Sequence, residues 1–212
     1  MAGFKGHVTF GIMTAVGYAG SVFILNITTI EVAQLSFFVT IFSSMLPDID
    51  SNSGTPVQIV FGVLSLLTML ITFDMLRHGH HISALNGCLS LLSGLGVYTI
   101  VQGLFKKMTH HRGAFHSIPM ALIFSLSTLT ILNHYPINPI ARLVLCGAVL
   151  VGYLCHLTLD ELNSLKTAST LALKPKKSFG TALKLTTPSS KATAIMYTSL
   201  CYLLYINQGL IL

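Results

Sequence analysis

The stretch that decides the fold is VQIVFGVLSLLTMLITFDML, residues 57–76. Asp74 is its single charged side chain, and most of the other residues are leucine, valine, isoleucine, methionine or phenylalanine. About 20 apolar residues in an α-helix cross the hydrocarbon core of a bilayer, because each residue adds about 1.5 Å to the helix. The stretch therefore predicts a membrane-spanning helix.

Apolar runs of this kind recur along the whole chain. Only 8% of the 212 residues are charged and 52% are hydrophobic, whereas a soluble domain carries about 25% charged residues. The further runs are residues 8–25, 32–46, 83–105, 118–133, 139–158 and 192–212. The runs 32–46 and 118–133 are short, which suits tilted or interfacial helices. The sequence predicts an all-α, polytopic membrane helical bundle of about seven transmembrane or interfacial helices, forming one membrane-embedded domain over residues 1–212.

The basic residues are distributed unequally between the two sides that seven spans would create. Of the 12 lysines and arginines, all except Arg77 and Arg142 fall on the side of the N-terminus. They are Lys5, Lys106, Lys107, Arg112, Lys166, Lys174, Lys176, Lys177, Lys184 and Lys191. Short loops rich in lysine and arginine face the cytoplasm, so this side is predicted to be cytoplasmic and to attract anionic lipids. No aromatic residues interleave with the lysines, so direct nucleic-acid binding is not expected.

Four polar motifs fall on this same side, each at the end of an apolar run. His7 precedes the first run, and LPDID (46–50) closes the second. HHRGAFHS (110–117) opens the fifth, and CHLTLD (155–160) closes the sixth. Ionisable groups at membrane depth are costly and are by default functional candidates. If the short runs also span, these groups converge at one face of the membrane.

Two of the motifs supply carboxylates. His156 and Asp160 are four residues apart and project from one face of a helix, which suits either a metal ion or a hydrogen-bonded helix end. Asp48 and Asp50 follow Pro47, where an irregular backbone can turn both carboxylates towards a cation or form a simple turn. Each motif alone is ambiguous.

The HHRGAFHS motif combines histidines with an arginine. His111 and His116 share a site only if the backbone bends at Gly113, which glycine permits. Arg112 offers a planar fork of donors suited to a phosphate oxygen, and Ser117 is expected to cap the following helix. The alternative interpretation is an interfacial basic loop.

Taken together, the motifs predict a metal site. Mixed histidine and aspartate donors without cysteine suit zinc, manganese or iron. The candidate ligands are His7, Asp48, Asp50, His111, His116, His156 and Asp160. These exceed the ligands that one tetrahedral zinc uses, so two divalent ions, or one ion with an acid–base partner, are expected.

Two further segments have weaker interpretations. RHGHHIS, residues 77–83, contains His78, His80 and His81 but falls on the opposite side, so it is interpreted as an extracytoplasmic loop. The lysine-rich segment 173–191 falls on the side of the candidate site. It either anchors the topology on acidic headgroups or covers the metal site and recruits an anionic lipid.

The motifs also carry a family resemblance. GH (6–7), LPDID (46–50), HRGAFHS (111–117) and GYLCHLTLDELNS (152–164) resemble the YdjM-like family of inner-membrane-associated metal-dependent hydrolases, also described as LexA-binding. More distantly, that family is similar to the zinc-dependent phospholipase C and P1 nuclease group, all-helical enzymes that cleave phosphoesters. The resemblance implies zinc at the seven candidate ligands, a bacterial inner membrane and a LexA-type partner. Asn163 and Ser164 depart from the threonine and glycine that many members have there.

The residues and the resemblance together predict a membrane-bound, metal-dependent hydrolase that cleaves a phosphoester of a lipid or lipid-linked substrate at the cytoplasmic face. Arg112 would neutralise charge on the phosphate, and Asp48 or Asp160 would act as a base instead of a ligand. Two alternatives stay open. A non-catalytic LexA-binding adaptor would not need the ligands. A metal-ion transporter would need polar groups through both halves of the bilayer.

Overall fold

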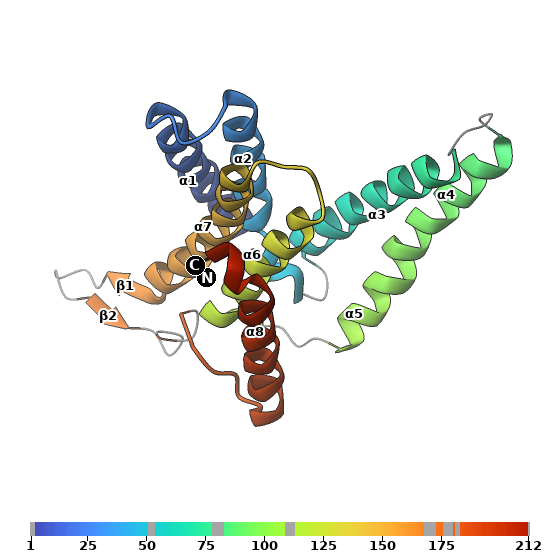
Figure 1. Cartoon of the computed structure of the whole chain (residues 1–212). Helices are drawn as coiled ribbons and strands as arrows, with labels where there is room; N and C mark the ends of the chain where they lie inside the picture. Colours follow the sequence, from blue (N-terminus) through green and yellow to red (C-terminus); the bar gives the residue numbers. More distant parts are fainter. Residues whose placement is uncertain are drawn as a thin grey trace. The chain divides into compact units, whose positions relative to one another are not determined.

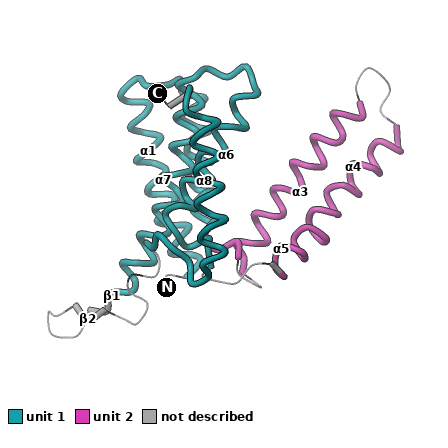
Figure 2. Tube along the Cα trace, turned by 60° about the horizontal axis from the view of Figure 1, so that its bottom comes forward, with its two compact units in different colours: residues 1–47, 112–212 teal, residues 48–111 magenta. Residues whose placement is uncertain are grey.

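The computed structural model describes residues 3–50, 54–77, 83–108, 113–167, 173–175, 180 and 183–211. The chain forms two compact units (Figure 2), residues 1–47 with 112–212 and residues 48–111. A helix covers most of the described residues of each expected apolar run (Figure 1), which confirms the predicted all-α class. The helices of the first unit are α1 (Phe4–Ile24), α2 (Ile30–Ser43), α6 (Ile118–Asn133), α7 (Pro139–Ser164) and α8 (Ser190–Ile211).

Five helical segments of the described chain are long and apolar enough to cross a membrane. They are Phe4–Ile24, Ile30–Asp50, Thr55–Leu76, Ala84–Lys107 and Pro139–Ser164. The second of these combines α2 with a 3-10 turn, η1 (Leu46–Asp50). The span is therefore longer than the run of apolar residues 32–46 in the sequence. Helix α6 is short, as predicted. Helix α8 has 22 residues but is not one of these five segments. The last expected run, residues 192–212, is therefore helical, but its described residues are not apolar enough to be among the candidate spans.

The first unit is organised around α7, which packs against α1, α2 and α6. The contact with α2 is very close, because a Cβ atom at Gly152 would overlap Ser43 Oγ and the Thr40 carbonyl. On α1, a Cβ at Gly11 would overlap Ser44 Oγ. Small residues at helix contacts let backbones approach closely, which stabilises helix pairs in lipid through van der Waals contact. These contacts hold the beginning of α1, the end of α2 and the end of α7 together.

The C-terminal helix α8 packs on α6. Asn207 is buried, and its Nδ2 donates to Thr130 Oγ1 at 2.8 Å. Leu126, Leu129 and Leu200 form the apolar part of this contact. A hydrogen bond between helices in an apolar setting adds to packing that is otherwise dispersive.

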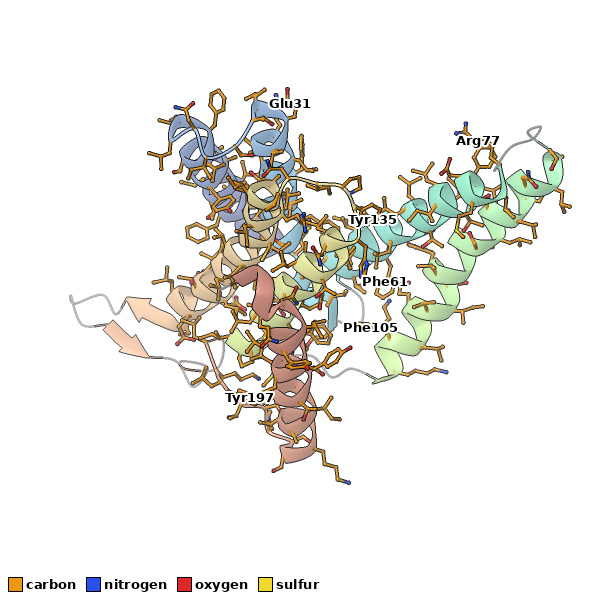
Figure 3. The ribbon with its side chains drawn as sticks, viewed as in Figure 1. Glu31, Phe61, Arg77, Phe105, Tyr135 and Tyr197 are labelled. Carbon is orange, nitrogen blue, oxygen red and sulfur yellow. The ribbon has the colours of Figure 1, made fainter. Side chains whose placement is uncertain are left out.

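The second unit is a helical hairpin. Its helices are α3 (Thr55–Leu76), α4 (Ala84–Gly96), a π-helical segment η2 (Val97–Val101) and α5 (Gln102–Met108). Ser65 Oγ of α3 donates to the Gly94 carbonyl of α4 at 2.7 Å, and Phe61 contacts Phe105 with ring centroids 5.5 Å apart (Figure 3). Most side chains of the hairpin are exposed, which fits helices that face lipid.

A short segment follows α7. Strand β1 (Leu165–Thr167) pairs antiparallel with β2 (Leu173–Pro175), a detail that the apolar pattern did not predict. The Gly180 N–H donates to Glu161 Oε1 at 2.5 Å, and the Lys184 carbonyl accepts from the Ile118 N–H at 3.1 Å. The segment is therefore attached beside the end of α7 and beside the start of α6.

Candidate metal centre

Three elements of the first unit bring four of the predicted ligands together. His7 lies in the first turns of α1, His116 lies just before α6, and His156 and Asp160 lie one turn apart near the end of α7. Asp160 Oδ1 is 3.2 Å from His7 Nε2, while Asp160 Oδ2 is 3.7 Å from His116 Nε2 and 3.9 Å from His156 Nε2. The side chains are at most 4% exposed. We call these four residues the His/Asp cluster.

The orientation of His156 is set by the end of α2. His156 Nδ1 lies 2.7 Å from the Ser44 carbonyl oxygen. Because a carbonyl only accepts hydrogen bonds, Nδ1 carries a proton in this contact. The other ring nitrogen, Nε2, lies 3.9 Å from the Asp160 carboxylate oxygen Oδ2. A metal ion bound by both groups, or a proton on Nε2, makes such a contact favourable.

The rings of His7 and His156 stack, with centroids 3.8 Å apart and planes 10° apart. Two charged imidazolium rings at this separation would repel strongly in a buried site. Neutral imidazole stacks without that cost and is also the form that binds metal. His7 Nδ1 is buried and, within the described part of the chain, has no hydrogen-bond partner. The stacked pair therefore brings ring nitrogens from α1 and α7 close together.

The turn that carries His116 is attached to α7. Tyr153, which is fully buried and lies one turn before His156, donates a hydrogen bond from its hydroxyl to the Phe115 carbonyl. Ser117 occupies the N-cap position of α6, as predicted, but its side chain makes no capping hydrogen bond. Its hydroxyl donates instead to the Ala114 carbonyl at 2.6 Å, which closes the turn before the helix. One helix thus positions three of the four cluster residues.

The cluster fits a zinc-type ion in both chemistry and size. Nitrogen and carboxylate oxygen are ligands that zinc accepts, at about 2.1 Å. Two donors on one tetrahedral ion therefore lie about 3.4 Å apart. Within the described residues, His7, His156 and Asp160 each have one donor atom within 4.8 Å of the others, which is close enough to bind one ion. The Ser44 carbonyl on His156 Nδ1 matches the outer hydrogen bond that a metal-binding histidine makes.

The remaining predicted site residues belong to the second unit or lie outside the described residues. Asp48 and Asp50 directly follow Pro47, the last residue of this part of the first unit, and they begin the second unit. His111 and Arg112 lie outside the described residues, as do His78, His80 and His81. The roles of all of these residues stay predictions.

Two contributors to the site were not predicted from the sequence. Ser44 acts through its backbone carbonyl, which every residue possesses, so no sequence signal distinguishes it. Tyr153 had a signal that went unused, because a tyrosine hydroxyl in an apolar helix needs a hydrogen-bond partner. Its position three residues before His156 places it on the same face of α7.

A helical membrane protein with a buried His/Asp cluster at the ends of its helices is the class that this fold and site define. The chain belongs to the YdjM inner membrane protein family, whose model matches residues 1–211. No curated protein and no solved structure is similar to the chain. The chain is thus a membrane protein of the YdjM inner membrane family, in agreement with the resemblance of its motifs.

Proposed function

We propose that this protein is a membrane-bound, metal-dependent hydrolase that cleaves a phosphoester of a lipid or lipid-linked substrate. The observation that carries the proposal is the convergence of four buried side chains, His7, His116, His156 and Asp160, from separate elements of the first unit. The Ser44 carbonyl, 2.7 Å from His156 Nδ1, orients the His156 ring towards this cluster.

His7, His116, His156 and Asp160 are the residues that would hold the ion. When bound, a divalent ion supplies positive charge that polarises a phosphoryl oxygen and lowers the pKa of a water molecule. Asp50 and His111 are the remaining candidate ligands and would complete a second metal position, with Asp48 among them only where it does not act as the base.

The protein residues have separate tasks in this proposal. Asp160 is surrounded by three imidazole rings, which suits a ligand better than a base. We therefore assign the base to Asp48, which would accept the proton of the attacking water. Arg112 would hold the phosphate through two parallel hydrogen bonds. Burial of the cluster excludes bulk water, which strengthens each of these interactions.

The unequal distribution of basic residues supports a cytoplasmic location of the site. Single cysteines introduced at Asn52, Lys107 and Lys177 should all be protected from an impermeant thiol reagent in intact cells. Cysteines at His80 and Tyr135 should be labelled. If the cysteines at Asn52 and Lys107 lie on opposite sides of the membrane, LPDID and HHRGAFHS do not share one site.

The test of activity uses purified full-length protein in detergent micelles with a panel of membrane phospholipids and lipid phosphates. We expect a released phosphate-containing or dephosphorylated product by mass spectrometry, and its loss after chelation and recovery after zinc is restored. If metal-loaded protein cleaves none of these and substitution of His156 leaves its role in cells unchanged, the adaptor alternative takes the place of the enzyme. Metal uptake into sealed vesicles without cleavage would instead favour the transporter.

A further inference from the structure

A groove of about 560 Å³ lies along the outer side of α1 and the end of α7. Its polar lining consists of Lys5, Thr9 and Asn163. Its apolar lining consists of Phe10, Met13 and Leu159. All of these residues belong to the first unit. The groove is therefore amphipathic.

The groove and the His/Asp cluster share the same helical turns. Phe10 follows His7 by three residues, Leu159 follows His156 by three, and Asn163 follows Asp160 by three. Residues three apart are neighbours on a helix surface, so each of these three groove residues borders a cluster residue. A ligand in the groove would thus lie within about one helical turn of the cluster.

The polar and apolar parts of the groove are ordered along α1. Lys5 lies at the start of this candidate span, where a lysine reaches the membrane interface. Met13 lies eight residues further on, about 12 Å along the helix axis, and is 65% exposed. The groove therefore presents a positive charge at one end and an apolar surface towards the middle of the helix.

We propose that this groove binds an anionic glycerophospholipid, with its phosphate at Lys5 and one acyl chain along Phe10, Met13 and Leu159. The positive charge complements the phosphate, and the apolar lining complements the chain. A free phosphate ion would leave the apolar lining unused. The further consequence, that this lipid or a close relative is the substrate, rests on the proposed function.

The binding test uses purified full-length protein in nanodiscs of phosphatidylcholine that contain a trace of phosphatidylglycerol with a photoreactive acyl chain. Illumination should attach the lipid to peptides that contain residues 5–13 or 159–163, both with and without chelator. Lys5→Gln should lower this attachment about fivefold, the size of one lysine–phosphate attraction at a membrane surface. Lys5→Arg should retain it. Lys191→Gln removes an equal charge from the first turn of α8 and should leave attachment unchanged.

A second variant tests the shape of the groove without changing charge. Thr9→Trp fills the groove from an exposed position and should also reduce attachment, whereas Ser21→Trp, on exposed α1 surface outside the groove, should not. Attachment that Lys5→Gln and Thr9→Trp both leave at the wild-type level would overturn the proposal. So would attachment mapped only to other helices, or equal competition by inorganic phosphate.

The two proposals fail separately in these measurements. Photolabelling needs no turnover and no metal, so specific attachment supports the groove even if no lipid is cleaved. Cleavage that persists in Thr9→Trp while labelling of the groove is lost would overturn its role as the substrate site.

Discussion

Helices α7 and α3 have similarly apolar sequences but very different surroundings. Of the 26 residues of α7, 12 are buried, including His156 and Asp160. Of the 22 residues of α3, four are buried, and all four lie in its first two turns. Two of the polar side chains along α3, Ser65 and Thr68, bond to backbone carbonyls. Asp74 pairs with Arg77 at the exposed end of the same helix.

The difference shows that hydropathy alone does not identify a functional helix. Both helices have the composition of a membrane span. Only α7 combines ionisable side chains with glycine contacts that bring other helices close enough to bury them. The predictions below change equivalent residues in the two regions, beginning with the largest expected effect.

Removal of a carboxylate should have a large effect in α7 and a small effect in α3. Asp160→Ala should lower metal affinity at least about 100-fold, because loss of a group that only orients a ligand already costs about 10- to 100-fold. Asp74→Ala removes an exposed pair with a 3.3 Å separation, which stabilises the protein by less than about 1 kcal/mol. Elemental analysis of both purified variants measures the contrast. Equal metal content in the Asp160→Ala and Asp74→Ala variants would show that Asp160 is not a metal ligand.

Replacement of an arginine by lysine separates substrate binding from metal binding. Arg112→Lys keeps the charge but loses the two-pronged geometry, so turnover should fall about 10- to 100-fold, as expected for a lost hydrogen bond between charged groups. Metal content should stay at the wild-type level. Arg77→Lys in the second unit is the matched control and should change neither quantity. A parallel loss of metal in Arg112→Lys would contradict a role confined to the phosphate.

Addition of a methyl group tests how tightly the two regions are packed. Gly152→Ala should destabilise the protein by about 1–3 kcal/mol or more, because the Cβ would overlap Ser43 and the Thr40 carbonyl. Gly62→Ala on α3 meets nothing within 4 Å and should be neutral or stabilising by up to about 1 kcal/mol. Denaturant titrations in detergent compare the two. Similar unfolding midpoints would mean that α2 and α7 do not approach as closely as described.

Removal of one hydroxyl should have the smallest effect. Tyr153→Phe loses the hydrogen bond to the Phe115 carbonyl, which stabilises the protein by about 1 kcal/mol. Because that bond positions the turn with His116, metal affinity should also fall, by about 10-fold. Tyr98→Phe in the second unit is 39% exposed and should leave metal affinity unchanged. If Tyr153→Phe is less stable but binds metal with unaltered affinity, Tyr153 stabilises the fold and does not position His116 for metal binding.

Much of the site was predictable because helix order constrains which ends meet. His7 at the start of one apolar run, His116 before another and His156 with Asp160 at the end of a third were expected on one side, and the structure brings them together. Spacing alone placed His156 and Asp160 on one helix face. The side chains were therefore predictable as a group, although their distances were not.

Other features depended on contacts that no local pattern records. The 3-10 extension of α2 to Asp50 and the pairing of β1 with β2 depend on backbone geometry. The Ser44 carbonyl depends on where α2 ends relative to α7. The contact between His156 Nδ1 and the Ser44 carbonyl is therefore one that no residue spacing predicts.

The sequence by itself determined the membrane environment, the all-α class and the family. Apolar composition and the order of four motifs do not depend on long-range geometry. The tertiary structure alone decided which polar groups share a site. Gly152 and Gly11 let three helices approach, and only that approach buries His7, His156 and Asp160 against one another. A metal site needs donor atoms within a few ångströms, and such distances arise from packing between segments that lie up to about 150 residues apart in the sequence.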